Sequence, residues 1–187
     1  MKWSEAFSRI RFWQTADRIG PDIPFTHWRL HFKSAMVDLC KSKFKYFGDC
    51  AEFRPGAYAI GCSQISLGRR VIIRPGCMLF ADETGGQITI EDDVMLGSGV
   101  HIYVANHRFN GIETPIIDQD YFQSKPVVLK KGSWIGSNVI ILPGITVGEN
   151  SVIGAGSVVT KSIPDRVVVA GNPARVIREI DGALGDS

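Results

Sequence analysis

The sequence has few of the residues that build metal centres and disulfide frameworks. It contains four cysteines and four histidines in 187 residues. The four cysteines form no C-x-x-C pair and show no metal-ligand spacing, and no histidines stand beside them in the sequence. We therefore predict free thiols and no metal site.

The sequence also lacks a strong charge of either sign and a long apolar run. The net charge is only +2, so there is no global electrostatic case for binding nucleic acid. The first residues, M-K-W-S-E-A-F-S-R-I-R-F-W-Q, interrupt their apolar positions with charges, which excludes a secretory signal and a membrane span there. From these absences we expect a cytoplasmic protein.

What the sequence does have is a six-residue repeat from Leu129 to Pro164. An aliphatic residue returns at every sixth position: Leu129, Ile135, Ile141, Val147, Ile153 and Val159. A period of six fits neither an α-helix nor a simple amphipathic strand, and it is typical of a parallel β-helix whose leading aliphatic residues stack inside a narrow prism. The second position is often glycine, and we expect that glycine to permit the backbone conformation of a corner.

The same region resembles a known family. The run I-G-S-N-V-I-I-L-P-G-I-T-V-G-E-N-S-V-I-G-A-G-S-V-V-T-K-S-I-P, followed by A-G-N-P-A-R-V-I-R-E-I, is similar to the C-terminal half of the hexapeptide-repeat acyltransferases. Among them it most resembles the maltose, galactoside, nodulation-factor and lipopolysaccharide O-acetyltransferases. The resemblance is close over Val127 to Ile180, loose over Ile65 to His107, and absent from the first fifty residues. It implies a left-handed coil, against the usual right-handed crossover rule, together with a homotrimer and acetyl-CoA as donor.

The predicted fold is therefore all-β: a left-handed parallel β-helix over residues 51–180, preceded by a helical segment over 1–50 and followed by a tail over 181–187. Coiling is expected to begin near Phe53. Earlier hexads place Leu67, Ile73, Leu79, Ile90, Leu96 and Ile102 inside the prism. Eleven residues instead of six separate Leu79 from Ile90, which predicts a bulge with Asp82 and Glu83 at its tip. That bulge is either a solvated turn or part of an acceptor site.

Phe25 to Phe47 is expected to form an amphipathic helix with mostly basic polar positions. Its apolar side chains recur at helical spacing: Trp28, Phe32, Ala35, Met36, Leu39 and Cys40. Two interpretations stay open. The helix either covers the open end of the β-helix or a neighbouring subunit, or makes a peripheral contact with the anionic inner face of a membrane.

A second and larger interruption separates Ile102 from Leu129. Residues 105–127 show no sixfold pattern, which predicts a protruding loop, and long irregular loops in compact domains usually serve a function. The loop opens with Asn106 and His107. In the family that the chain resembles, the catalytic histidine stands at this departure point, so we predict that His107 is the catalytic residue.

The chemistry of acetyl transfer agrees with a histidine. A hydroxyl that attacks a thioester must lose its proton, and imidazole can accept a proton near neutral pH and return it to the leaving thiolate. A carboxylate such as Glu113 or Asp118 could orient the ring. Candidate acceptor contacts are Asp82, Asn106 and His101.

The resemblance also assigns the donor site. Carried over position by position, it implies coenzyme A contacts from Ser137, Ala155, Thr160, Lys161 and Arg178, with Arg175 close by and Trp134 near the thioester or between subunits. The three cations are suited to the phosphates of the coenzyme, although an ordinary solvated surface would carry the same residues.

These observations predict an acetyl-CoA-dependent O-acetyltransferase that modifies a saccharide, in surface-polysaccharide or lipopolysaccharide synthesis. An N-acetyltransferase acting on an amino-sugar nucleotide or an antibiotic is the first alternative, and a non-catalytic β-helix scaffold is another. A zinc hydratase of the γ-carbonic anhydrase kind needs three histidines, whereas only His101 and His107 lie in the coils.

Overall fold

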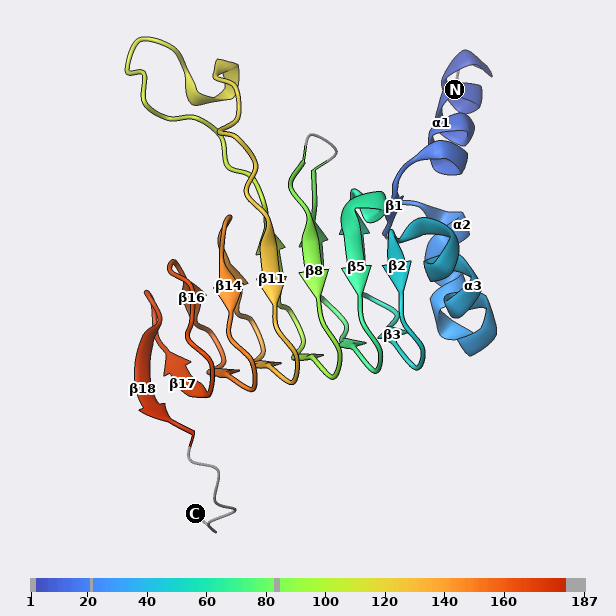
Figure 1. The fold of residues 1–187 in the computed structure, drawn as a ribbon. Helices are drawn as coiled ribbons and strands as arrows, with labels where there is room; N and C mark the ends of the chain where they lie inside the picture. Colours follow the sequence, from blue (N-terminus) through green and yellow to red (C-terminus); the bar gives the residue numbers. More distant parts are fainter. Residues whose placement is uncertain (1–2, 21, 83–84, 181–187) are drawn as a thin grey trace.

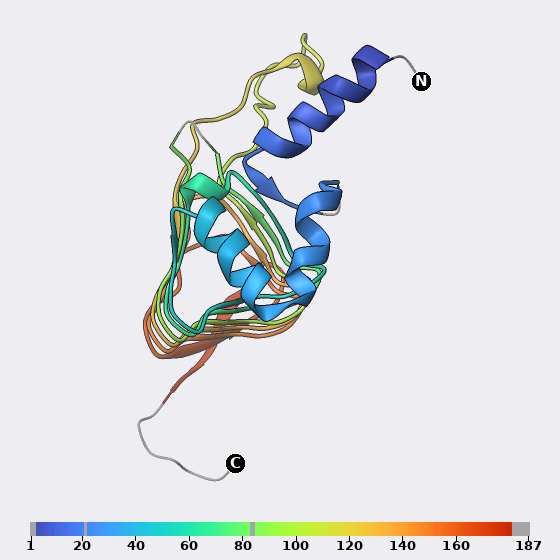
Figure 2. The same ribbon diagram turned by 90° about the vertical axis from the view of Figure 1, so that its right-hand side faces the viewer.

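The computed structural model describes residues 3–20, 22–82 and 85–180, and within them the chain winds into a three-sided prism (Figures 1 and 2). Each face of the prism is a sheet made of one short strand from each turn. Sheet A contains β1 (Arg18–Ile19), β4 (Tyr58–Ile60), β7 (Met78–Phe80), β10 (His101–Tyr103), β13 (Ile140–Ile141) and β16 (Val158–Val159). Sheet B contains β2 (Tyr46–Phe47), β5 (Ile65–Leu67), β8 (Ile88–Ile90), β11 (Val127–Leu129) and β14 (Thr146–Val147). Sheet C contains β3 (Glu52–Phe53), β6 (Ile72–Ile73), β9 (Met95–Leu96), β12 (Trp134–Ile135), β15 (Val152–Ile153), β17 (Val167–Ala170) and β18 (Arg175–Glu179).

The predicted left-handed parallel β-helix is confirmed. Every leading aliphatic of the hexads is buried, and equivalent residues of successive turns face each other; Ile102, for example, is in register with Leu79 on one side and Ile141 on the other. Because each turn buries its apolar residues only against its neighbours, the stacked column is one continuous core.

The hexad glycines serve a different purpose from the one predicted. Gly136 and Gly148 do not have the left-handed backbone of a corner; instead, a Cβ atom at Gly148 would collide with the carbonyl group of Pro164 in the next turn. Glycine is needed there because two turns of backbone approach closely. The left-handed corner positions are other residues, which recur turn by turn: Cys50, Arg70, Asp93, Gly132, Asn150 and Arg166 at one edge, and Gly56, Gly76, Gly99, Asn138 and Gly156 at another.

The coil begins before Phe53, at Tyr46 and Phe47 of β2, which pair with Ser66 and Leu67 of the next turn. Phe47 and Phe53 are both buried. The irregular spacing of this first turn has a local cause. The 3-10 helix η2 (Cys62–Gln64) occupies the corner between β4 and β5, so this turn holds more residues than a strict hexad pattern allows.

The expected helix over Phe25 to Phe47 is wrong in its extent. The structure divides this segment into α2 (Pro24–His27), the 3-10 helix η1 (Trp28–His31) and α3 (Lys33–Lys43), followed by β2. Three of the six expected apolar positions, Met36, Leu39 and Cys40, are buried in the same core as the coils, whereas Trp28 and Phe32 are more than half exposed. Figure 1 shows α3 at the N-terminal end of the prism, so α3 covers the first turn.

Two further segments rise from the edge of the prism between sheets A and B. Helix α1 (Trp3–Thr15) buries none of its residues and leads into β1, which pairs antiparallel with β4. The predicted loop leaves after β10, carries the 3-10 helix η3 (Ile116–Asp118) and returns at β11. Figures 1 and 2 show α1 and this loop projecting on the same side of the coil. The predicted tail, residues 181–187, lies outside the described residues.

Candidate active site

An open trough of about 910 Å³ lies between α1, the outer surface of sheet A and the base of the protruding loop. Its lining comes from three parts of the chain: Phe12, Thr15, Ala16, Asp17 and Arg18 from α1 and the segment after it; Ile60, Gly61, Phe80, Ala81, Asp82, Tyr103 and Val104 from the coils; and Ala105, Asn106, His107 and Tyr121 from the loop. The trough therefore unites three predicted residues, Asp82, Asn106 and His107, with residues that the sequence did not indicate.

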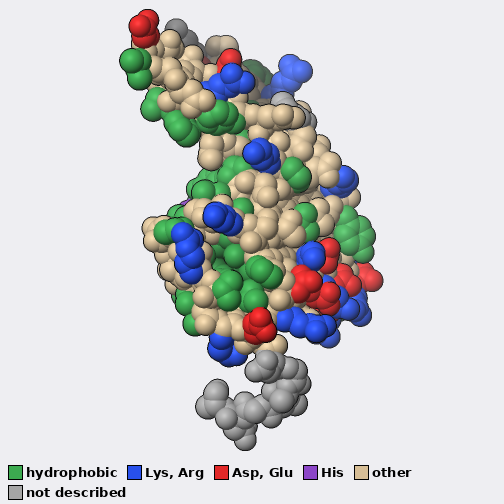
Figure 3. All heavy atoms as spheres, turned by 60° about the vertical axis from the view of Figure 1, so that its left-hand side comes forward, with side chains coloured by type: hydrophobic (Ala, Val, Ile, Leu, Met, Phe, Trp, Pro, Cys, Tyr) green, Lys and Arg blue, Asp and Glu red, His purple; other side chains and the backbone are tan. Residues whose placement is uncertain are grey.

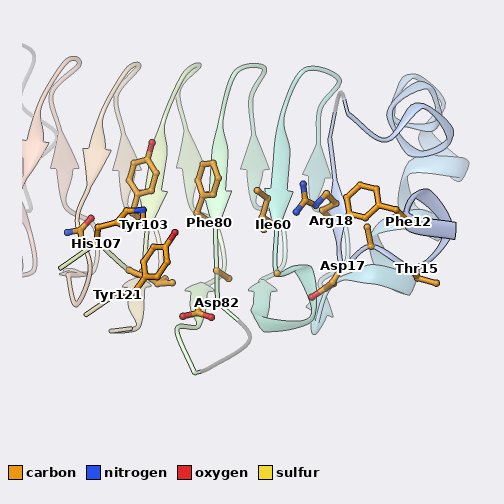
Figure 4. Close-up of a pocket in the computed structure, with 16 residues that line it drawn as sticks. Phe12, Thr15, Asp17, Arg18, Ile60, Phe80, Asp82, Tyr103, His107 and Tyr121 are labelled. Atoms are coloured by element: carbon orange, nitrogen blue, oxygen red, sulfur yellow. The ribbon is translucent and has the colours of Figure 1, made fainter. Parts of the chain in front are cut away.

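His107 stands at one end of this trough (Figure 4). It forms an antiparallel bridge with Tyr121, and the two rings lie 4.1 Å apart between centroids. On either side, the Arg108 N–H donates to the Asp120 carbonyl at 2.7 Å, and the Phe122 N–H donates to the Asn106 carbonyl at 2.9 Å. The two ends of the loop thus form a short ladder, which holds an exposed imidazole in a defined place while the rest of the loop projects into solvent.

The bulge at Asp82 is joined to the same ladder. The Ser124 hydroxyl donates to the Asp82 carboxylate, and the Lys125 N–H donates to the Val104 carbonyl at 2.8 Å. Asp82 also pairs with Gly86 across the turn. These contacts hold Asp82 along the side of the trough near Phe80, between its two ends (Figure 4). Glu83, expected beside it at the tip, lies outside the described residues.

His101 does not line the trough. It lies on the outer surface of β10, where its Nδ1 is 3.2 Å from the hydroxyl of Tyr103. Tyr103 is the residue of β10 that lines the trough. Glu113 and Asp118 are exposed along the loop, and the hydrogen bonds among the described residues include none from His107 to either carboxylate.

The predicted donor residues fall outside the trough, toward the C-terminal turns. Ser137 and Ala155 occupy the edge between sheets C and A in successive turns, where the Gly156 N–H donates to the Ser137 carbonyl at 2.8 Å. A Cβ atom at Gly156 would have no neighbour within 4 Å, so this edge is open to an extended ligand. Thr160 and Lys161 follow β16 and are exposed.

The two predicted arginines lie on β18. Arg175 pairs with Ala170 of β17. The preceding residue, Ala174, donates its backbone N–H to the Val158 carbonyl of β16 at 2.8 Å. Arg175 therefore lies near the edge that carries Ala155. Arg178 lies farther along β18. Lysine and arginine side chains are visible around this end of the molecule in Figure 3. Trp134 is half exposed on the outer surface of sheet C, in register with Met95 and Val152.

The cysteines near the coils are unsuited to nucleophilic chemistry. Cys62 and Cys77 are fully buried. Burial raises the pKa of the Cys62 thiol to about 12 and also raises the pKa of Cys77, so the reactive thiolate is scarce in both. Among the described residues there is also no cluster of three or more histidine, cysteine, aspartate or glutamate side chains that could hold a metal ion.

The sequence did not reveal Tyr121 or the residues at the far end of the trough, Phe12 and Arg18. Tyr121 lies in the loop, where no periodicity predicts which residue returns to pair with His107. The one sequence signal near it is the aromatic pair Tyr121-Phe122 just before the repeat resumes. Phe12 and Arg18 come from the first fifty residues, where the sequence motifs showed no resemblance to the family. The antiparallel pairing of β1 with β4 brings this segment to the trough.

Comparisons with known proteins agree with this architecture. Residues 126–161 match the bacterial transferase hexapeptide family (six repeats). The chain is 39% identical to the galactoside O-acetyltransferase of Escherichia coli (strain K12) over 76% of its own length and 68% of that protein. It spans 57% of the length of several putative acetyltransferases of Staphylococcus aureus, at 42% identity.

Solved structures give the same result. A galactoside acetyltransferase in complex with coenzyme A superposes with a TM-score of 0.72 at 32% identity, covering 95% of this chain and 80% of the other. A hexapeptide-repeat acetyltransferase of Vibrio cholerae complexed with acetyl coenzyme A superposes with a TM-score of 0.73 at 25% identity, covering 87% and 91%. With its hexapeptide coils, its histidine at the base of the loop and these relatives, the chain belongs to the hexapeptide-repeat acetyltransferase family.

Proposed function

We propose that this protein is an acetyl-CoA-dependent O-acetyltransferase that acts on a saccharide hydroxyl, with His107 as the catalytic base. The observation that carries the proposal is the position of His107: the loop ladder holds its imidazole at the end of a trough that also contains Asp82 and Asn106. Relatives bound to coenzyme A and acetyl coenzyme A support the donor, and the galactoside O-acetyltransferase among the relatives supports the acceptor class.

The reaction is a direct transfer. The acceptor hydroxyl oxygen attacks the thioester carbonyl carbon while the imidazole of His107 accepts the hydroxyl proton. The new C–O bond forms, the C–S bond breaks, and the coenzyme leaves as a thiolate that takes the proton back from the imidazolium. The products are an acetyl ester and free coenzyme A. No acyl-enzyme is required, because a thioester is already activated and both substrates can be held together.

The donor is assigned to the open edge formed by Ser137 and Ala155. An extended pantetheine chain can accept and donate hydrogen bonds along such a backbone edge, and Gly156 leaves room for close approach. Lys161, Arg175 and Arg178 are assigned to the phosphates, since charge-assisted contacts to phosphate are the strong ones. Thr160 belongs to the same end of the molecule, and Trp134 is assigned to the thioester end or to a contact between subunits.

The acceptor is assigned to the trough. Asp82 and Asn106 offer a carboxylate and an amide to sugar hydroxyls beside His107. His101 lies on the outer surface of β10, outside the trough, and its acceptor contact stays a proposal. A role in surface-polysaccharide or lipopolysaccharide synthesis, on the cytoplasmic side of the membrane, is the setting that we propose for this activity.

Two associations complete the proposal. A homotrimer is supported by apolar side chains that a single chain leaves exposed, including Trp134 on sheet C and Ile117 on the loop. A peripheral membrane contact through residues 25–47 is supported by the exposed lysines of α3, Lys33 and Lys41. The helices of the described chain are each too short or too polar to cross a bilayer.

The test is release of coenzyme A thiol from acetyl-CoA by the purified protein, measured with a panel of sugars and sugar nucleotides that includes amino sugars. We expect turnover with a hydroxyl acceptor. Transfer to the amino sugars alone would replace O-acetylation with N-acetylation, and no transfer to any member of the panel would contradict the proposal.

A further inference from the structure

The charge of this chain is distributed unevenly between its N-terminal segment and its coils. Residues 1–47 contain nine lysines and arginines against four aspartates and glutamates, whereas the net charge of the whole chain is only +2. The residues after 47 therefore carry more acidic than basic side chains. Figures 1 and 2 show the helices of the N-terminal segment at one end of the prism, with α2 and α3 in front of the coils in Figure 2. That end of the molecule is basic.

Helix α3 carries part of this charge on its exposed side. Lys33, Val37 and Lys41 are four residues apart, and residues at this spacing share one side of a helix. Both lysines are exposed, and Val37 is half-buried. Asp38 is the one acidic residue of α3, and the ion pairs of the described residues include none between Asp38 and either lysine. Both cations are therefore available to an anionic partner.

Two aromatic side chains adjoin these lysines. Trp28 of η1 and Phe32, the residue before α3, are 56% and 57% exposed, and their rings meet edge to face with centroids 5.9 Å apart. An open depression of about 790 Å³ lies beside Phe32, and Lys33 and Val37 also line it. The core of the prism includes neither aromatic ring. We call this surface the terminal face, and it consists of Trp28, Phe32, Lys33, Val37 and Lys41.

Helix α1 repeats the same combination of side chains at this end of the molecule. Trp3, Phe7 and Ile10 lie on one side of α1 and are 81%, 69% and 41% exposed. Arg9 and Arg11 of the same helix are exposed as well. Exposed aromatic and basic side chains thus recur on two separate elements, which indicates a broad partner surface and not a single narrow groove.

We propose that the terminal face docks on a lipid bilayer that contains anionic phospholipids. Trp28 and Phe32 enter the headgroup region, where aromatic side chains are favoured, and Lys33 and Lys41 lie against the lipid phosphates. The inference rests on the peripheral contact in the proposed function, and it assigns the anchoring side chains and the charge of the lipid.

A second copy of this chain is a poorer occupant of the terminal face. Two such faces would bring lysines of the same charge together, and like charges across an interface are costly. The proposed trimer uses other side chains, Trp134 on sheet C and Ile117 on the loop, so it does not require the terminal face.

The experiment measures sedimentation of the full-length protein with vesicles, without acetyl-CoA. One set of vesicles contains phosphatidylcholine alone, and the other contains equal parts of phosphatidylcholine and phosphatidylglycerol. We expect binding to the anionic vesicles, weaker binding as salt is raised, and little binding to the neutral vesicles. Removing two charges with Lys33→Gln and Lys41→Gln together should weaken binding about tenfold or more.

The aromatic anchor is tested with Phe32→Ser. Phe32 is the N-cap residue of α3, and serine is favoured at an N-cap, so this variant should keep the helix and its circular dichroism. Loss of the inserted ring should weaken binding to the anionic vesicles about tenfold.

Matched controls change the same kinds of side chain elsewhere. Lys125→Gln and Lys131→Gln together remove two charges from other exposed positions. Phe109→Ser removes a loop ring that is 64% exposed and also packs edge to face, on Phe122. Both controls should bind anionic vesicles as the wild type does.

The possible results separate this inference from the proposed reaction. Absent binding, equal binding to neutral and anionic vesicles, or equal losses in the lysine variant and its control would overturn the terminal face as a membrane site. A fall in mass in light scattering for Phe32→Ser, without vesicle binding by the wild type, would assign the face to another copy of the chain and overturn the inference as well. Acetyl transfer in solution is measured separately by thiol release, so its absence would contradict the proposed reaction without changing the result for vesicles.

Discussion

At the scale of single residues, His107 carries the proposed chemistry and little of the stability. Its side chain is exposed and packs mainly on Tyr121. We expect His107→Ala to lower kcat by about 10²–10⁴-fold, the usual contribution of a general base. Thermal stability and coenzyme A binding should stay close to those of the wild type, as measured by thermal unfolding and calorimetry.

The size of the residual rate decides whether His107 is the base. Retention of more than about a tenth of kcat would instead place the base elsewhere.

Two buried serines at equivalent hexad positions predict opposite effects on stability. The Ser151 hydroxyl donates to the Pro164 carbonyl at 2.6 Å and accepts the Val167 N–H at 3.2 Å, whereas the buried Ser133 hydroxyl has no hydrogen-bond partner among the described residues. An unpaired buried hydroxyl costs about 1–3 kcal/mol. Ser133→Ala should therefore leave the free energy of unfolding unchanged or raise it, and Ser151→Ala should lower it by about 1–3 kcal/mol.

Chemical denaturation of the two variants checks this prediction, and each serves as the control of the other. The same loss of stability in both would mean that the Ser133 hydroxyl is hydrogen-bonded in solution, and the predicted difference between the two hexad positions would then be wrong.

At the scale of the elements, the sequence predicted those parts of the fold that follow the six-residue repeat. Every sixth aliphatic from Leu129 to Val159 is buried, and the interruptions at Asp82 and after Ile102 became the bulge and the loop. The physical reason is that a hexad residue meets its own equivalent in the next turn, so a one-dimensional pattern fixes the contact. The prediction that the hexad glycines form corners was wrong, because these glycines are needed where the backbones of two turns approach each other. The approach of Gly148 to Pro164 is a contact between turns that no local propensity describes.

Elements without a period could not be derived in this way. The segment expected as one helix up to Phe47 ends at Lys43, because Phe44 and Phe47 are buried with Phe53 in the first turn of the prism. The far half of the trough depends on β1 pairing antiparallel with β4. Two strand residues carry no sequence pattern from which such a pairing could be predicted.

The C-terminal elements that carry the proposed donor cations allow a kinetic prediction. Lys161 follows β16 and Arg178 lies on β18, and both are exposed. A phosphate contact far from the thioester is the same in the ground state and the transition state, so Lys161→Ala or Arg178→Ala should raise KM for acetyl-CoA and leave kcat nearly unchanged. A charge-assisted hydrogen bond of about 1.5–3 kcal/mol corresponds to an increase of about tenfold to a hundredfold. Initial rates at varied acetyl-CoA measure both constants, and a loss of kcat at constant KM would remove these residues from the phosphate site.

At the scale of the whole molecule, one chain leaves apolar side chains exposed on two surfaces far apart in the sequence. Met95, Trp134 and Val152 form an outward column on sheet C, with Trp134 half exposed. On the protruding loop, Ile112 is fully exposed and Ile117 is 84% exposed. Exposed apolar patches of this kind mark surfaces that bind other proteins. A homotrimer in which the loop of one chain covers a neighbour would bury them.

The loop provides the sharpest test of this assembly. Ile117→Asp places a charge on a side chain that the isolated chain leaves in water, so it should not alter the coil, but it should weaken an interface that buries the residue. We expect the wild-type mass in light scattering to be three times the chain mass of 20.6 kDa, and the variant to dissociate on dilution with unchanged circular dichroism.

Gln123→Asp adds the same charge at another exposed position of the loop and should remain trimeric. A monomeric wild type, or an Ile117→Asp variant as stable in assembly as Gln123→Asp, would contradict the proposed trimer contact.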